Sequence, residues 1–313
     1  MPSPRLLFRP RAAVIAATLV GLALLTSCLP VTPGPGPTPP VRLPANRYGS
    51  LVFSAAQVTK TADVVFGSGP DLVTHTPVTL RLDTYVPTAA ADPQPTGRPA
   101  IIWLYGGGFA GGRKEDVGGT ASEYARRGYV TIAPNYRVDP GNDCQAVQHG
   151  TTTDITRCAA AIWGAQHDAQ AAVRWVRAHA AQLGVDPNKI AAGGFSAGAI
   201  TALNLAYHAD DPGTSGNPGY SSRVSAAVAA SGCEEDPTVI GLWDAPVSII
   251  ASHDDPAVFY SCTAQTVATA RAAGLVADLH DYPGALHAGD LYLAHKATTD
   301  AQWATFLTTW LKL

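Results

Sequence analysis

A serine stands at the centre of the run 194–198, which reads Gly-Phe-Ser-Ala-Gly. A serine in this pattern can attack a carbonyl carbon when a tight turn between a strand and a helix exposes its hydroxyl. The flanking glycines suit that turn because strand and helix approach each other closely there. Residues 189–193 have the character of a short strand and residues 199–207 that of a helix. We therefore predict that Ser196 is a nucleophile.

A serine nucleophile needs a base within hydrogen-bond reach and a carboxylate that orients the base. In a chain with this turn, the acid is expected after the serine and the histidine after the acid. Asp255 follows an apolar run at residues 247–251, and His287 follows another at residues 275–282. Asp255 and His287 are therefore predicted to be the acid and the base.

Neighbouring residues compete for both roles. Asp254 can be presented by the same loop as Asp255, and the spacing Asp-Pro-x-Val favours Asp255 while leaving geometry to decide. The acidic run 234–236 also follows a predicted strand, and we interpret it as a solvated loop. His253 beside the two aspartates fits a solvated turn better than a metal site. Two further histidines lie inside a predicted strand and a predicted helix: His280 and His295.

A glycine run over residues 106–108 follows the apolar run 100–104. Glycines without side chains allow backbone N–H groups to point into a cavity, where they can stabilise the negative oxygen that forms during attack on a carbonyl. We predict that the N–H groups of Gly107, Gly108 and Ala197 form this oxyanion hole.

Several elements must position these residues. From about residue 63 onward, short runs rich in Val and Ile alternate with longer segments of helical period. This alternation predicts an α/β fold with a mainly parallel central sheet, helices on both faces and no large cap domain. Segments 138–160 and 210–222 are expected as loops over the site. The predicted strands are residues 78–86, 100–104, 129–133, 189–193, 224–230, 247–251 and 275–282, and the predicted helices include 117–127, a long one that ends near 186, and 199–207.

The first residues are not expected to belong to the fold. Three arginines precede an apolar run over residues 12–25, which is too short for a stable membrane span and is typical of an export signal. We predict a signal over residues 1–27 and a tether rich in Pro and Gly over residues 28–46. The catalytic domain is then expected over residues 47–313.

Five cysteines occur in the chain. If Cys28 is used at the processed N-terminus, four remain, and an even number in an exported chain favours disulfides. Three pairings are possible. Cys144 and Cys158 would close a short loop, and Cys233 and Cys262 then pair by elimination.

Composition excludes some partners and cofactors. The formal net charge is −3, and basic residues do not gather in a stripe, so we expect no nucleic-acid partner. No cysteine has metal-site spacing, and the predicted chemistry needs no cofactor and no metal.

The order Tyr-Gly-Gly-Gly-Phe (105–109), Gly-Phe-Ser-Ala-Gly (194–198), Asp-Pro-x-Val (255–258) and Gly-x-x-His (284–287) resembles the α/β-hydrolase esterases of the hormone-sensitive-lipase and carboxylesterase kind. The smaller of these esterases usually have His where this chain has Tyr105, a difference expected to change the support of the glycine loop more than the reaction. The resemblance implies an α/β-hydrolase fold and cleavage of esters through an acyl-enzyme.

Residues 25–28 read Leu-Thr-Ser-Cys, which resembles the lipobox of bacterial lipoproteins. This resemblance implies lipidation at Cys28 and a position on the outer side of the cell membrane, with the membrane contacted only through the lipid. Without lipidation, the same signal would give a secreted protein.

We predict a serine hydrolase acting on a small-molecule or polymeric carboxylic ester. A serine peptidase or amidase of the same fold is an alternative, although the chain lacks an obvious propeller or helical cap. A surface binding module without catalysis is a further alternative, and the presence of candidates for all three roles argues against it.

Overall fold

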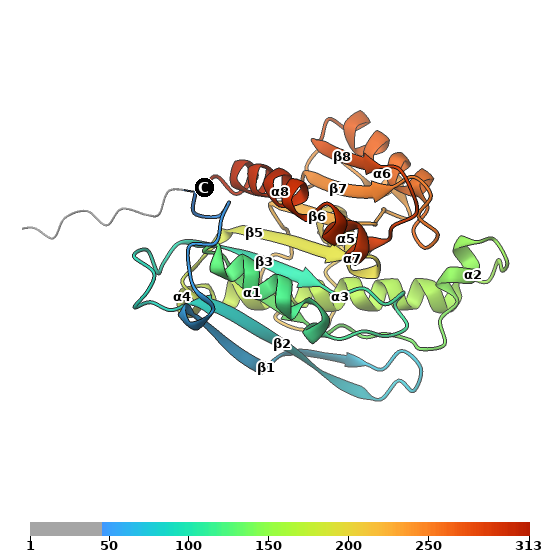
Figure 1. Ribbon diagram of the computed structural model, residues 1–313. Helices are drawn as coiled ribbons and strands as arrows, with labels where there is room; N and C mark the ends of the chain where they lie inside the picture. Colours follow the sequence, from blue (N-terminus) through green and yellow to red (C-terminus); the bar gives the residue numbers. More distant parts are fainter. Residues whose placement is uncertain (1–45) are drawn as a thin grey trace, which may run out of the picture. The chain divides into compact units, whose positions relative to one another are not determined.

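The computed structural model describes residues 46–313 (Figure 1). The predicted signal over residues 1–27, the lipidation of Cys28, and the tether up to residue 45 lie outside the described residues. From residue 46 to the C-terminus, no helix combines the length and the apolar character that a membrane span requires.

One sheet of eight strands organises the described chain, with the order β1-β2-β4-β3-β5-β6-β7-β8. The two strands β1 and β2 pair antiparallel, β2 pairs antiparallel with β4, and every pair from β4 to β8 is parallel. This arrangement confirms the predicted α/β fold with a mainly parallel sheet. The strands are β1 (Val58–Pro70), β2 (Pro77–Pro87), β3 (Arg98–Leu104), β4 (Val130–Pro134), β5 (Val185–Phe195), β6 (Ala226–Ala230), β7 (Val247–Ser252) and β8 (Ala277–Tyr282).

The central strands are apolar along their whole length because helices cover both faces of the sheet. Every residue of β3, β4, β6 and β7 is buried. Figure 1 shows α1 and α8 in front of the sheet and α3 behind it, and α5 packs against α3. The helices are α1 (Gly118–Arg126), α2 (Cys144–Gln148), α3 (Thr156–Ala178), α4 (Ala180–Leu183), α5 (Ala197–Tyr207), α6 (Tyr260–Ala272), α7 (Ala288–Ala294) and α8 (Lys296–Trp310), with 3-10 turns η1 (Ala55–Gln57), η2 (Lys114–Val117) and η3 (Pro237–Val239).

Three features differ from the sequence-based expectations. Strand β1 was not predicted, because it is an edge strand whose side chains are mostly exposed and do not alternate. The long helix expected to end near residue 186 instead breaks at His179, and Gly184 ends its short continuation with a φ of 66°. The segment 210–222 packs beside β1 and α3, where Ser215 accepts a bond from the N–H of Ser68 and donates to Asp168, so it does not cover the predicted site.

Candidate active site

Ser196 occupies the turn between β5 and α5 in a strained backbone conformation, with φ 54° and ψ −124°. The glycines on either side have no room for a side chain. A Cβ on Gly194 would lie 2.0 Å from the carbonyl oxygen of Gly198, and a Cβ on Gly198 would lie 2.2 Å from that of Leu104. Strand, turn and helix therefore meet closely, as the spacing of the two glycines predicts, and the serine is held at the carboxyl edge of the sheet.

The structure brings Ser196, His287 and Asp255 together. His287 Nε2 lies 2.8 Å from Ser196 Oγ, and His287 Nδ1 lies 2.8 and 2.9 Å from the two carboxylate oxygens of Asp255. The three residues follow β5, β8 and β7, so parallel strands deliver them to one edge of the sheet. With its proton on Nδ1, the imidazole donates to Asp255 and can accept the serine proton at Nε2.

Asp255 is only 4% exposed. Burial alone would raise its pKa, but hydrogen bonds from His287, Ser231 and the backbone N–H groups of Val258 and Ala257 together hold the pKa below the usual value. The carboxylate therefore stays ionised near neutral pH, which is the state needed to orient an imidazole.

None of the rival residues takes part in the contacts among Ser196, His287 and Asp255. Asp254 is exposed, and its backbone N–H donates to Gly284. Three further rivals contact other partners: His253 binds Asp281, His295 stacks on Tyr282, and Glu234 of the acidic run binds His208. Burial lowers the pKa of His280 within β8.

The glycine loop lies against the serine turn. A Cβ on Gly106 would come within 3.2 Å of Ser196 Cβ, so the two segments touch. Gly107 and Gly108 have φ angles of 129° and 59°, which glycine adopts readily. Within residues 46–313, no hydrogen bond uses the N–H of Gly107 or Gly108, and Ala197 begins α5, where an N–H has no acceptor inside the helix.

A cavity of about 640 Å³ opens beside Ser196. Its wall includes Val117 and Thr120 near α1, Phe195 before the serine, and Leu293 from α7. Gln145 of α2 also lines it, so part of the segment 138–160 does reach the site, as expected. Most of this wall is apolar, which suits the hydrocarbon part of a substrate.

Ser231 is a residue of the site that sequence analysis missed. It follows β6 with a φ of 54°, its hydroxyl accepts the N–H of Ala288 at 2.9 Å, and its nearness to Asp255 helps to lower the pKa of that carboxyl group. Because Ala288 directly follows His287, Ser231 holds the backbone next to the base and also lies beside the acid. The sequence could have indicated Ser231 only by its position after a predicted strand, because Ser196 and Asp255 occupy the same kind of position.

Two disulfides flank the site and join the pairs that the sequence predicts. Cys144 at the start of α2 bonds to Cys158 in α3, and Cys233 after β6 bonds to Cys262 in α6. The first bond anchors the short helix that carries Gln145.

Known proteins share part of this sequence. The model of the BD-FAE family matches residues 82–235, which include the glycine loop and Ser196 but neither Asp255 nor His287. Esterase LipI of Mycobacterium tuberculosis is 30% identical over 122 residues, which are 39% of this chain and 32% of LipI. Fumonisin B1 esterase of Sphingopyxis macrogoltabida is 34% identical over 109 residues, 35% of this chain and 19% of that protein. The matched region thus spans about a third or less of these relatives.

Solved structures share the fold. The apo form of Thermogutta terrifontis esterase 2 superposes with a TM-score of 0.61 at 22% identity, covering 78% of this chain and 94% of that one. The same enzyme phosphorylated by paraoxon gives a TM-score of 0.61 at 24% identity, covering 82% and 95%. Together with the sheet order and the serine turn, these similarities show that the chain has the α/β-hydrolase fold, and that part of its sequence is similar to esterases.

Proposed function

We propose that this protein hydrolyses carboxylic esters through an acyl-enzyme on Ser196. The observation that carries the proposal is the continuous contact from Ser196 Oγ through both nitrogens of His287 to the buried carboxylate of Asp255, at 2.8 Å at each step. This order of hydroxyl, imidazole and carboxylate supports activation of the serine by a general base.

In the first step, Ser196 Oγ attacks the ester carbonyl carbon while His287 Nε2 takes the hydroxyl proton. The tetrahedral intermediate collapses, the bond to the alcohol oxygen breaks, and His287 returns the proton to the leaving alcohol. Water then attacks the acyl-serine, again losing a proton to His287, and the carboxylic acid leaves as Ser196 regains its proton. Asp255 stays ionised and stabilises the imidazolium in each half.

The negative oxygen of each intermediate would lie at the N–H groups of Gly107, Gly108 and Ala197. Their lack of other acceptors in the described chain supports this role, since fixed donors stabilise developing charge without reorganisation. Each donor of this kind contributes about 3–4 kcal/mol to lowering the barrier.

The cavity wall gives the substrate its general character. A volume of about 640 Å³ and side chains such as Val117, Phe195 and Leu293 favour an ester with a hydrocarbon portion. Relatives of part of this chain include proteins named as esterases, which supports ester over amide cleavage.

We also propose export, with lipid on Cys28 and residues 28–46 as the tether. The two disulfides favour an oxidising compartment, and one relative is named a secreted lipase. In cells fed radiolabelled palmitate, the wild-type protein should carry the label and the Cys28→Ala variant should not. Equal labelling of the two proteins would contradict lipidation at this residue.

Nitrophenyl esters of increasing acyl length test the catalytic proposal. We expect turnover by the wild type and a loss of at least about a thousandfold in kcat for Ser196→Ala. Ser221→Ala, in an exposed loop, should keep full activity. A folded wild type that hydrolyses none of the esters would contradict the proposal, and cleavage of nitroanilides alone would identify an amidase.

A further inference from the structure

A second cavity of about 460 Å³ lies away from Ser196, between α3, α5 and the loop after β6. One side is formed by the acidic run 234–236 and the other by apolar side chains of α3 and the residue before it. We call this space the acidic cavity. The esterase mechanism uses none of its side chains, so its composition needs a separate explanation.

The charges of the acidic cavity are almost all negative. Glu234, Glu235 and Asp236 line it, and within residues 46–313 its wall contains no lysine or arginine. The one basic group is His208, whose Nε2 lies 3.2 Å from Glu234 Oε1. Glu234 is 3% exposed and also accepts the N–H of Asp236 at 3.1 Å, so its carboxylate has structural partners. A ligand would therefore meet mainly Glu235 and Asp236.

Gln166 supplies a further acceptor in the same wall. Its side chain is 1% exposed, and its Oε1 has no hydrogen-bond partner within the described chain. A buried carbonyl oxygen without a donor costs free energy, and a ligand that brings an N–H group removes that cost. This orphaned acceptor is independent of the carboxylates and indicates the same ligand chemistry.

Glu235 is the carboxylate available to such a ligand. Its side chain makes no hydrogen bond or ion pair with any described residue, although the residues around it, Glu234 and Asp236, both do. Desolvation by neighbouring atoms and the adjacent charge of Glu234 raise the pKa of Glu235, even though the side chain is exposed to solvent. A cation beside it would favour its ionised form.

Two large apolar side chains remain exposed at the opposite side of the cavity. Trp163 is 58% exposed and Ile155 is 57% exposed, and both line the space that Glu235 faces. An indole face attracts cations, and aliphatic carbon packs on both side chains. The cavity thus offers acceptors at one side and an apolar surface at the other.

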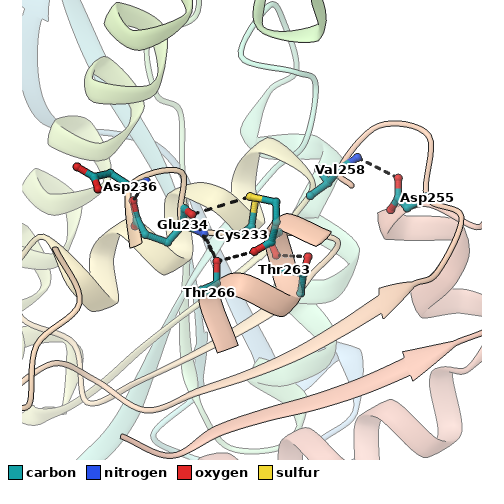
Figure 2. The surroundings of a disulfide bond; sticks show 9 residues. Cys233, Glu234, Asp236, Asp255, Val258, Thr263 and Thr266 are labelled. Atoms are coloured by element: carbon teal, nitrogen blue, oxygen red, sulfur yellow. Dashed lines mark hydrogen bonds between the residues drawn. A yellow bond between two sulfur atoms is a disulfide. The ribbon is translucent and has the colours of Figure 1, made fainter. Parts of the chain in front are cut away.

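A smaller cavity of about 240 Å³ lies beside the acidic cavity. It shares Val147, Cys158 and Glu235 with the acidic cavity. Its lining residue Val258 directly follows Ala257, which lines the cavity beside Ser196. Figure 2 shows Cys233 between the loop of Asp255 and Val258 and the loop of Glu234 and Asp236. The disulfide of Cys233 joins the loop of Glu234 to α6.

We propose that the acidic cavity binds an alkylammonium or alkylguanidinium group, with the charged nitrogen at Glu235 and Gln166 Oε1 and the alkyl stem on Trp163 and Ile155. The group belongs either to the far end of an extended ester substrate or to a separate small cation. Only the first of these two sources rests on the proposed esterase function.

Calorimetric titration with butylguanidinium tests the site directly, at about pH 8 so that most free histidine is neutral. We expect saturable binding of one molecule, weakened about tenfold or more by Glu235→Gln and by Trp163→Ala. The neutral pentan-1-ol, of similar length, should bind far more weakly. Asp186→Asn removes one negative charge at the start of β5 and should leave the affinity unchanged.

Two nitrophenyl esters of matched length distinguish the sources: 6-ammoniohexanoate and heptanoate. If the group belongs to the substrate, Glu235→Gln lowers kcat/KM about tenfold for the charged ester only. If Glu235→Gln has the same effect on kcat/KM for both esters, or no effect on either, the bound cation is a separate ligand. Nitrophenyl acetate, too short to reach the acidic cavity, should be hydrolysed equally by wild type and Glu235→Gln.

Absence of saturable butylguanidinium binding would overturn the proposal, as would equal affinity in wild type and Glu235→Gln. These outcomes are separable from failure of the esterase function, because that failure would appear as no hydrolysis of nitrophenyl acetate by the wild type, whatever the titration gives.

Discussion

Tyr105 and Tyr136 stack their rings, and the hydroxyl of each bonds to the backbone of the other. Their ring centroids lie 4.1 Å apart in a stacked arrangement, the Tyr105 hydroxyl donates to the Tyr136 carbonyl at 3.0 Å, and the Tyr136 hydroxyl donates to the Tyr105 carbonyl at 2.6 Å. Tyr105 also accepts the N–H of Tyr136 at its hydroxyl oxygen. The pair joins the end of β3, where the glycine loop begins, to the chain after β4.

Tyr136→Phe should therefore weaken both the fold and catalysis. The substitution leaves the buried carbonyl of Tyr105 without this donor, which costs about 1–3 kcal/mol in the free energy of unfolding. Because Tyr105 directly precedes Gly106, we expect kcat for nitrophenyl acetate to fall more than KM changes. Urea unfolding and steady-state kinetics measure the two effects. Tyr220→Phe, at an exposed ring, is the control, and equal behaviour of the two variants would contradict this role.

Ser231 is expected to act as a positioning residue for His287 and Asp255. Ser231→Ala removes the acceptor of the Ala288 N–H and a donor to Asp255, and a displaced imidazole should lower kcat roughly ten- to hundredfold. The acid limb of the pH profile should also move, which a purely structural loss would not cause. Ser248→Ala is a matched control, since the buried Ser248 hydroxyl has no partner in the described chain. An unchanged kcat and pH profile in Ser231→Ala would exclude the role.

Removal of each disulfide should give different results. The separations of 14 and 29 residues predict losses of about 3 and about 3.6 kcal/mol in the free energy of unfolding for the double serine variants at Cys144/Cys158 and Cys233/Cys262. Only the first bond anchors the helix of Gln145, so only its loss should raise KM for long-chain esters. A larger rise in KM from the second pair would contradict the assignment of α2 to the substrate wall.

The contact between His208 and Glu234 predicts a pH-dependent stability. The hydrogen bond to Glu234 raises the pKa of His208, and the charges of Asp211 and Asp236 act in the same direction. A raised folded-state pKa stabilises the protein fully below the unfolded value of about 6.5, and this contribution is lost as the pH rises through the folded value. His208→Gln should thus destabilise more at about pH 5.5 than at about pH 8.5. Urea unfolding at both values tests this, with His75→Gln at an exposed site as the control.

Catalytic candidates were predictable from sequence where a motif coincided with the end of a strand. Ser196, Asp255 and His287 each follow a predicted strand, and parallel strands bring such positions to one edge. The choice between Asp254 and Asp255 needed coordinates, because the side chains of adjacent loop residues point in different directions and the sequence does not show which one faces His287. Ser231 belongs to no motif, and its hydroxyl gains meaning only from the position of Ala288.

The fold was predictable where burial is two-sided. Apolar runs identified β3, β4, β6 and β7, which are buried throughout. The edge strand β1 carries mostly exposed side chains, and its partner β2 defines it through backbone pairing that composition does not encode. Likewise, the acidic run 234–236 was interpreted as a solvated loop, although Glu234 is buried against His208. A charged sequence does not reveal a partner that is distant along the chain.

Strand β8 ends the sheet and pairs with β7 alone. Apart from Ala277, its residues are at least partly exposed, and the loop after it supplies His287. Edge strands open locally at a lower free energy than central ones. Heating should therefore abolish hydrolysis, measured at temperature, before far-ultraviolet circular dichroism reports loss of the sheet, and coincident transitions would contradict this. Local opening of β8 then limits how long the protein stays active. Substitutions that stabilise this edge strand would lengthen its active lifetime without any change in the core.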